Sequence, residues 1–169
     1  MAGSVVYRGR VFWVEVEDVT LPKGQVTEIA IVHHRPSVVL IPITDDGRIV
    51  MIQQYRHALK RAVWELPAGN VEAGELPEAA AARECEEEIG EVPSRVERVG
   101  AFFPTPGYCD EEMIFFRVSG LHTPPADSPN KPDADEDITR SEMSAAEAKA
   151  MVARGEIVDL KTAYALTLV

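Results

Sequence analysis

The amino-acid sequence predicts an α/β fold in which a mixed β-sheet lies between helices, as an α/β/α sandwich. Segments with β-strand periodicity are interleaved with two longer helical patterns along the 169 residues, and no segment is repeated. Hydrophobic residues make up 46% of the chain, and a chain of this length can bury a substantial core. We therefore expect one domain that covers residues 1–169.

The strands are predicted from periodicity and from the turn residues between them. Residues 26–33 alternate between two sets of side chains, and residues 37–43 form a continuous β-branched run, typical of a strand buried on both faces. Asp45-Asp46-Gly47 predicts a hairpin turn after that run. The other predicted strands lie within residues 7–19, as one or two strands, and at residues 48–55, 63–66, 96–103 and 113–118.

The best-defined helix is predicted at residues 77–89. Pro77 suits a first helical turn, where its missing N–H group would have no partner in any case. The alanines at 79–82 favour a helix, and Gly90 supplies the left-handed residue that commonly ends one.

Two further helices are expected after a long loop. Residues 122–137 are rich in Pro, Asp and Ala and are predicted to be a loop. Ser144 is expected to cap a helix that runs to residue 154, with Glu147 at the matching capping-box position. A shorter helix starts at Leu160.

Composition limits the classes of partner. The formal charge of −11 argues against nucleic acid, since binding to a phosphate backbone needs a basic surface. No apolar run approaches the ~18 residues that a membrane span needs, and the first residues lack a signal-peptide pattern. Cys85 and Cys109 lack a metal-ligand spacing and are interpreted as reduced thiols, with Cys85 on the buried side of its helix. We expect a cytoplasmic protein without nucleic-acid or membrane partners.

Three glutamates of the helix at 77–89 share one face. Glu84, Glu87 and Glu88 are spaced at i, i+3 and i+4, where like charges destabilise an isolated helix by roughly 0.2–0.5 kcal/mol per pair. A divalent cation stabilises such a cluster of hard oxygen ligands, and Mg²⁺ is the usual one beside phosphates. The alternative interpretation of the glutamates alone is a solvated acidic face.

The residues around these glutamates favour the metal site. A fixed spacing runs through Gly69, Glu75, Arg83, Glu84, Glu87, Glu88 and Gly90. This spacing resembles the Nudix box, the signature of the Nudix hydrolase family. Glu91 departs from the pattern, because an aliphatic residue is usual there, but that position packs the helix end and is not a ligand. The segments QQYRHAL, WELPAGNVEAGE and FFPTPGYCDEEM, together with Pro106 after the box, are similar to the ADP-ribose pyrophosphatase branch.

The resemblance implies the Nudix sandwich fold and hydrolysis of a diphosphate bond. The expected reaction is Mg²⁺-dependent cleavage of ADP-ribose or a related nucleoside diphosphate sugar into a nucleoside monophosphate and a sugar phosphate, and Mn²⁺ can replace Mg²⁺. Two alternatives stay open. One is a Nudix hydrolase of another nucleoside diphosphate derivative, such as a GDP-sugar or a dinucleotide. The other is a non-catalytic domain that senses a nucleotide metabolite.

The resemblance also implies roles within the box. Glu84 and Glu88 are the expected principal metal ligands, and Glu87 contributes through a second ion or a bound water. The backbone carbonyl of Ala68 is expected to complete the metal site. Arg83 lies four residues before Glu87 and is expected to hold that carboxylate in position, the alternative being an ordinary surface ion pair.

Other residues are candidates for substrate contacts. Arg56 is a candidate for gripping a substrate phosphate, since a guanidinium recognises phosphate bidentately. By resemblance, Glu111 lies in a loop that borders the metal site and the nucleotide. Glu75 stands at the start of the helix, where a loop-holding role and a metal role both remain open.

The general base is expected from the acidic run before residue 138. By resemblance, a base in this branch comes from an acidic loop well after the box that tends to carry two glutamates one residue apart. Ala134 stands at the first of these places and Glu136 at the second, so Glu136 is the preferred base, with Asp135 as the substitute. A missing base and a merely solvated acidic loop are the alternatives.

The N-terminal strands, about residues 1–35, are expected to form a homodimer. The segment carries closely spaced aromatic and apolar residues, among them Phe12 and Trp13. In the resembling branch such strands reach the partner's nucleotide pocket, so Arg10 and Val11 are candidate substrate-binding residues. Plain core packing of these side chains is the alternative.

Overall fold

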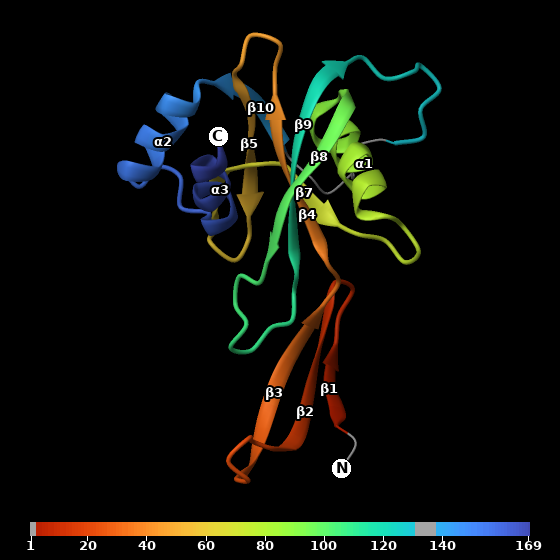
Figure 1. Cartoon of the computed structure of the whole chain (residues 1–169), viewed down its shortest axis with the longest axis vertical. Coiled ribbons are helices and arrows are strands. Elements are labelled where there is room, and N and C mark those ends of the chain that lie inside the picture. The colour runs from red at the N-terminus through yellow and green to blue at the C-terminus, as the bar shows by residue number, and fades with distance from the viewer. Residues whose placement is uncertain (1–2, 131–137) are drawn as a thin grey trace.

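The computed structural model describes residues 3–130 and 138–169 (Figure 1). The larger of its two sheets contains β4 (Ser37–Ile43), β5 (Ile49–Arg56), β6 (Arg61–Glu65), β7 (Ala68–Asn70), β8 (Val92–Phe102), β9 (Met113–His122) and β10 (Ile138–Met143). Its order is β10-β5-β4-β9-β8, with β6 paired to β5 and β7 to β4. The sheet is mixed, because β4 and β9 are parallel whereas the other pairs are antiparallel.

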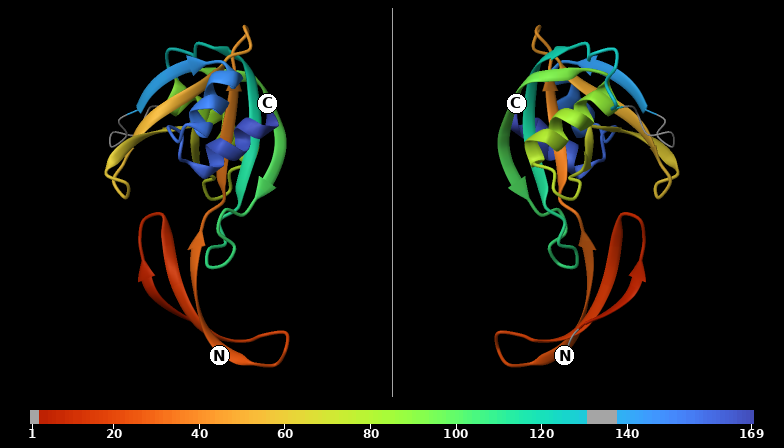
Figure 2. Two further views of the ribbon diagram at one scale, coloured as in Figure 1. Left: turned by 90° about the vertical axis from the view of Figure 1, so that its left-hand side faces the viewer. Right: turned by 90° about the vertical axis from the view of Figure 1, so that its right-hand side faces the viewer.

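Helices cover both faces of this sheet. α1 (Pro77–Ile89) lies on one face, and α2 (Ala145–Ala153), α3 (Leu160–Ala165) and the 3-10 turn η1 (Leu166–Leu168) lie on the other (Figures 1 and 2). One apolar cluster joins the sheet to α1, and a second joins it to α2 and α3. The predicted α/β/α sandwich with a mixed sheet is therefore confirmed. Within the described ranges, none of the helices is long and apolar enough to cross a membrane.

β4 contributes to both apolar clusters. Residues 37–42 are buried, as expected for a strand that is covered on both faces. Val38 and Leu40 belong to the cluster under α1, whereas Val39 and Ile41 belong to the cluster under α2 and α3. Successive side chains of a strand point to opposite faces, so a continuous apolar run fills both layers.

The helix ends follow the sequence signals. Pro77 is the first residue of α1, and Gly90 ends the helix with a φ of 78°, a left-handed conformation that glycine adopts without steric cost. Ser144 caps α2, since its side chain accepts a hydrogen bond from the N–H of Glu147 at 3.1 Å. Cys85 of α1 is fully buried against the sheet, and this burial raises the pKa of its thiol to about 12.

The N-terminal residues form a second, three-stranded antiparallel sheet that projects from the sandwich (Figures 1 and 2). It consists of β1 (Ser4–Arg8), β2 (Phe12–Thr20) and β3 (Val26–His34). Apolar side chains on this sheet are exposed in the single chain, including Val5, Val6, Tyr7, Phe12 and Val26. The core of this chain therefore does not bury them.

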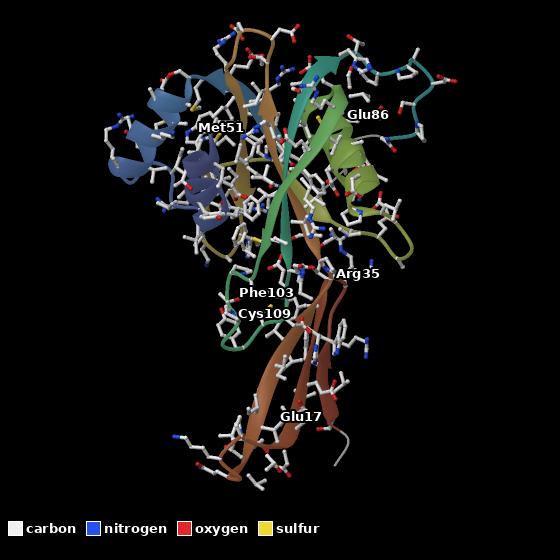
Figure 3. All side chains as sticks on the ribbon, viewed as in Figure 1. Glu17, Arg35, Met51, Glu86, Phe103 and Cys109 are labelled. Atoms are coloured by element: carbon white, nitrogen blue, oxygen red, sulfur yellow. The ribbon has the colours of Figure 1, made fainter. Side chains whose placement is uncertain are left out.

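A loop between β8 and β9 braces the sandwich end of β3. The N–H of Val32 donates to the backbone oxygen of Tyr108 at 2.7 Å, and the N–H of His34 donates to the carboxylate of Asp110 at 2.9 Å. Cys109 lies between these two contacts, in the loop beside β3 (Figure 3). These bonds fix the direction in which the projecting sheet leaves the sandwich.

The sequence prediction omits two strands, β7 and β10. β7 has no β-branched residue, and it is extended because Ala68, Gly69 and Asn70 pair with Val39, Val38 and Ser37 of β4. β10 is an edge strand that pairs with β5 over its whole length, directly after the predicted loop. Both strands depend on pairing with segments far away in the chain, which local patterns do not reveal.

Candidate active site

A pocket of about 630 Å³ brings together residues from the N-terminal turn, the sandwich and α1. This volume is in the usual range for a small-molecule site. Most residues that the sequence predicts for the site line this pocket: Arg10, Val11, Arg56, Ala68, Arg83, Glu84, Glu87 and Glu111. Glu88 adjoins them through Ala68, whose backbone N–H donates to its carboxylate at 2.9 Å.

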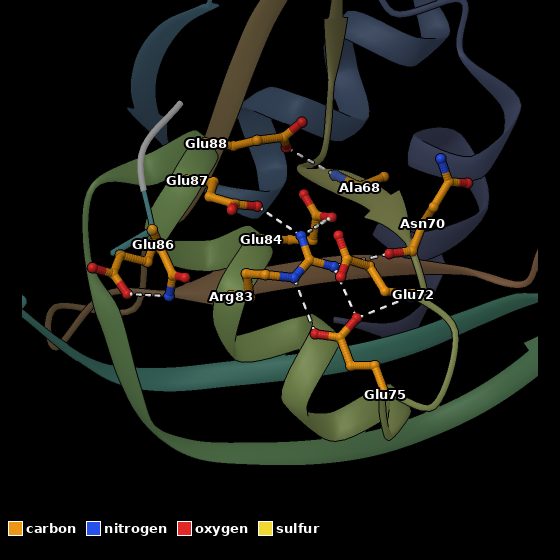
Figure 4. Close-up of polar contacts among 10 residues, drawn as sticks. Ala68, Asn70, Glu72, Glu75, Arg83, Glu84, Glu86, Glu87 and Glu88 are labelled. Carbon is orange, nitrogen blue, oxygen red and sulfur yellow. Dashed lines mark hydrogen bonds and ion pairs between the residues drawn. The ribbon is translucent and has the colours of Figure 1, made fainter. Parts of the chain in front are cut away.

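The guanidinium of Arg83 is the centre of a hydrogen-bond network among the residues of the box (Figure 4). Its Nη1 donates to Glu84 and to Glu87, at 2.7 Å in each case. Its Nε and Nη2 donate to the two carboxylate oxygens of Glu75 at 3.0 Å, and Nη2 also donates to the backbone oxygen of Asn70 at 2.9 Å. All five N–H groups therefore have acceptors. These bonds, that to Glu75 first, raise the pKa of Arg83 above its ordinary value.

Glu75 holds the loop that precedes α1. Besides binding Arg83, its carboxylate accepts a hydrogen bond from the backbone N–H of Glu72 at 3.0 Å. The bonds from Arg83, followed by that from Glu72, keep the pKa of Glu75 below its ordinary value despite partial burial. Of the two roles left open for Glu75, the geometry favours loop-holding.

Gly69 allows Glu84 to approach the backbone of β7. A Cβ atom built at residue 69 would overlap the Glu84 carboxylate, so only glycine leaves room for it. Glu84 is buried, with 8% of its surface exposed. A buried carboxylate needs compensation, and Arg83 supplies it here.

The box carboxylates are hard oxygen ligands, the kind that a divalent cation such as Mg²⁺ binds. Glu84, Glu87 and Glu88 stand on two successive turns of α1 and would offer oxygen ligands to such an ion. Arg83 contacts Glu84 and Glu87. Within the described residues, no group of three or more His, Cys, Asp or Glu side chains is arranged so that it could hold a metal ion. The assignment of Glu84, Glu87, Glu88 and the Ala68 carbonyl as metal ligands stays a prediction.

Arg56 reaches the pocket from β5 and is held by Glu65 of β6. Its Nε and Nη2 donate to the two carboxylate oxygens of Glu65, both at 2.7 Å. Lys161 of α3 binds the same carboxylate. Burial alone would raise the pKa of Glu65, but the hydrogen bond from Arg56 and the charge of Lys161 outweigh it and keep the pKa below its ordinary value. The sequence analysis missed Glu65 and Lys161, which lie 96 residues apart in the chain.

Glu111 lies where the two sheets meet. Its carboxylate accepts a hydrogen bond from the hydroxyl of Ser37 at 2.8 Å and lies 3.6 Å from Nδ1 of His34. His34 and Ser37 also line the pocket. Glu111 is therefore held by residues of β3 and β4 in the pocket wall, and its role towards substrate stays a prediction.

The candidate bases Glu136 and Asp135, and Ala134 beside them, lie outside the described residues. Asn130, the last described residue before them, donates to the carboxylate of Glu86 on α1 at 2.7 Å. Ile138, the first residue after them, pairs with Gln54 of β5. The assignment of Glu136 as base stays a prediction.

The structure is an α/β/α sandwich with an acidic helix, α1, along one side of a pocket. Comparisons with known proteins assign this combination to a family. A family model described as the NUDIX domain matches residues 33–161. The chain is 36% identical over 166 residues to an ADP-ribose pyrophosphatase of Bacillus subtilis (strain 168), covering 98% of this chain and 89% of that protein. The chain belongs to the Nudix family.

Two further comparisons extend this similarity. The chain is 36% identical over 161 residues to a methanol dehydrogenase activator of Bacillus methanolicus, covering 95% of this chain and 86% of that protein. A solved structure described as an ADP compounds hydrolase superposes with a TM-score of 0.80 at 22% identity, covering 99% of this chain and 89% of that one. The latter likeness confirms the fold.

Gly69→Ala is expected to destabilise the protein by about 1–3 kcal/mol, the usual cost of forcing extra atoms into a packed site. The added methyl group would displace the buried Glu84 carboxylate and break its bond to Arg83. Gly107→Ala is the control, because a Cβ atom there meets nothing within 4 Å, and its effect should stay within about 0.5 kcal/mol. Urea unfolding measures both. Equal stability of the two variants would contradict the close approach.

Proposed function

We propose that the protein is a metal-dependent pyrophosphatase that cleaves ADP-ribose or a related nucleoside diphosphate sugar into a nucleoside monophosphate and a sugar phosphate. One observation carries this proposal: the carboxylates of Glu84 and Glu87 and the guanidinium of Arg56 line the same pocket of about 630 Å³. The similarity over nearly the whole chain to an ADP-ribose pyrophosphatase supports the choice of substrate.

The first assignments concern the metal ion and the residues that hold its ligands in position. Glu84, Glu88, Glu87 and the Ala68 carbonyl would hold Mg²⁺, or Mn²⁺ in its place, and such an ion activates water and neutralises charge on the diphosphate. Arg83 keeps the carboxylates of Glu84 and Glu87 at fixed positions on α1.

The remaining assignments concern the substrate and the proton. Arg56 has N–H groups beyond those that bind Glu65 and donates them to a phosphate oxygen. Glu111 orients the substrate at the edge of the pocket. The attacking water forms a bond to one phosphorus of the diphosphate while Glu136 accepts its proton, and the bond from that phosphorus to the bridging oxygen breaks, so the other phosphate leaves with that oxygen.

The assembly that we infer is a homodimer formed through the projecting sheet, and the turn with Arg10 and Val11 would then serve the pocket. Both residues line the pocket within one chain. Because Cys85 and Cys109 are free thiols, we also infer a cytoplasmic location.

The decisive experiment for the function is incubation of the protein with a panel of substrates in the presence of Mg²⁺, with products identified by mass. The panel contains ADP-ribose, other nucleoside diphosphate sugars including a GDP-sugar, and dinucleotides. AMP and ribose 5-phosphate from ADP-ribose would support the proposal. If a GDP-sugar or a dinucleotide is cleaved in preference to ADP-ribose, that compound becomes the assigned substrate. Tight binding without turnover would indicate a sensor.

Glu84→Gln and Glu88→Gln are each expected to lower kcat by about 10²-fold or more, since a bound metal supplies several kcal/mol of transition-state stabilisation. Glu78→Gln is the matched control, because Glu78 is an exposed residue of the same helix. Excess chelator should abolish the activity, and Mg²⁺ or Mn²⁺ should restore it. Full activity in chelator, or in both variants, would refute the metal assignment.

Glu136→Gln is expected to cut kcat by roughly 10²–10⁴-fold, the usual contribution of a general base. KM should change little, because the lost interaction acts mainly in the transition state. Asp135→Asn is the control and should matter much less. Wild-type kcat in Glu136→Gln, together with a faster Ala134→Glu variant, would show that this chain lacks the base.

Val6→Asp is expected to convert a dimer into a monomer. Val6 lies on β1 with 61% of its surface exposed in the single chain, and exposed apolar patches commonly mark interfaces. Val158→Asp is the control, since Val158 is 45% exposed but lies outside the N-terminal sheet. Light scattering at micromolar concentration measures the mass. A monomeric wild-type protein would refute the inferred dimer.

A further inference from the structure

A charged cluster adjoins the pocket where α3 meets the strands β5 and β6. Its centre is Glu65, which is only 3% exposed and binds Arg56 through both carboxylate oxygens at 2.7 Å. The ammonium of Lys161 binds the same carboxylate and lies 3.0 Å from the carboxylate of Asp159. Arg56, Lys161 and Asp159 all line the pocket.

Both cations keep hydrogen-bond donors that these carboxylates do not use. A guanidinium has five N–H groups, and Glu65, the only acceptor of Arg56 in the described part of the chain, takes two of them. An ammonium has three, and Glu65 and Asp159 face two of those of Lys161. The remaining donors belong to residues of the pocket wall.

The contribution of this cluster to the stability of the fold does not by itself explain the burial of its charges. Glu65 is 3% exposed and the side chain of Lys161 is 10% exposed, so both charges have lost most of their hydration. The loss of hydration of a buried ion pair largely cancels its attraction, and an apolar pair of similar volume is often as stable. The cost of burying these charges is offset when the unused N–H groups of Lys161 and Arg56 in the pocket wall bind an anion.

The position of Arg56 relates this cluster to the box. Arg56 lines the same pocket as Glu84 and Glu87 of α1, so its guanidinium and the box carboxylates border one space. A diphosphate has two phosphoryl groups close together. One group can meet a cation held by the box while the other meets Arg56 and its neighbour.

We propose that Lys161 binds a phosphate of the nucleoside diphosphate substrate together with Arg56, and that Glu65 positions both cations. This inference rests on the proposed function of the same pocket. Lys161 is thereby a substrate-binding residue contributed by α3, and Glu65 is a positioning residue that does not touch the substrate. The short helix near the C-terminus then forms part of the site.

Lys161→Met tests the binding role, because it removes the charge and keeps the length of the side chain. The KM for ADP-ribose should rise by about tenfold to a hundredfold, the range expected for a lost hydrogen bond to a charged group, with a smaller change in kcat. Lys161→Arg keeps a cation and should restore most of the affinity. Lys149→Met is the control, since Lys149 of α2 binds the backbone of Val169 and does not line the pocket.

Glu65→Gln tests the positioning role. The amide keeps the shape but loses the charge that orients the two cations, so KM should rise severalfold. Binding of ADP and of adenosine, measured by calorimetry, separates a local effect from a distorted pocket. In Lys161→Met and Glu65→Gln, affinity for ADP should fall, whereas affinity for adenosine, which has no phosphate, should not.

The outcomes are distinct for the two proposals. A wild-type protein that binds ADP but cleaves no substrate would refute the proposed hydrolysis and still allow the calorimetric test of Lys161. Unchanged KM and ADP affinity in Lys161→Met, or an equal loss of ADP and adenosine binding, would overturn the role of Lys161. If Lys161→Met does not fold, as judged by its thermal transition, Lys161→Gln takes its place in the same measurements.

Discussion

The five hydrogen bonds of the Arg83 guanidinium are the constraint on which the site depends. They join α1 to the preceding loop through Glu75 and to β7 through the Asn70 backbone. Within α1 they hold the carboxylates of Glu84 and Glu87, two residues that line the pocket. Without this cation, Glu84 and Glu87 would repel each other on one face of the helix. The same residue thus permits the acidic cluster and fixes the loop that closes it.

This network requires that α1 and β7 come very close, and the sheet provides that closeness. β7 pairs with β4, the strand that both helical layers cover, so its backbone cannot move away from α1 without breaking the core. Gly69 removes the Cβ atom that would separate the backbone from Glu84. The site geometry is therefore a consequence of core packing, because the buried side chains of Ala81 and Cys85 hold α1 against the sheet beside the buried carboxylates of Glu84 and Glu88.

Local patterns in the sequence predict the parts of this structure that local forces determine. The continuous apolar run of β4, the proline and glycine at the ends of α1, and the Ser144 cap all act within a few residues, and they are found where expected. The spacing of the box predicts the Arg83–Glu87 contact for the same reason. β7, β10 and the Glu65–Lys161 contact arise from segments that meet only in the folded chain. Periodicity and residue spacing describe only nearby residues, so they do not predict contacts between segments that are distant in the sequence.

A chain with a formal charge of −11 needs local reversal of its field in order to hold an anionic diphosphate. The net charge of the protein cannot attract the diphosphate, because long-range repulsion from an acidic protein lowers the local concentration of anions. The pocket meets the difficulty by grouping Arg10, Arg35, Arg56 and Lys161 in its wall, with carboxylates suited to a divalent cation beside them. A bound divalent cation would offset the charge of two of the carboxylates and so shift the field of this wall towards positive. Such an ion would then contribute to substrate affinity as well as to the chemical step, and the buried Glu65, which binds both Arg56 and Lys161, would limit how far these two cations move towards the substrate.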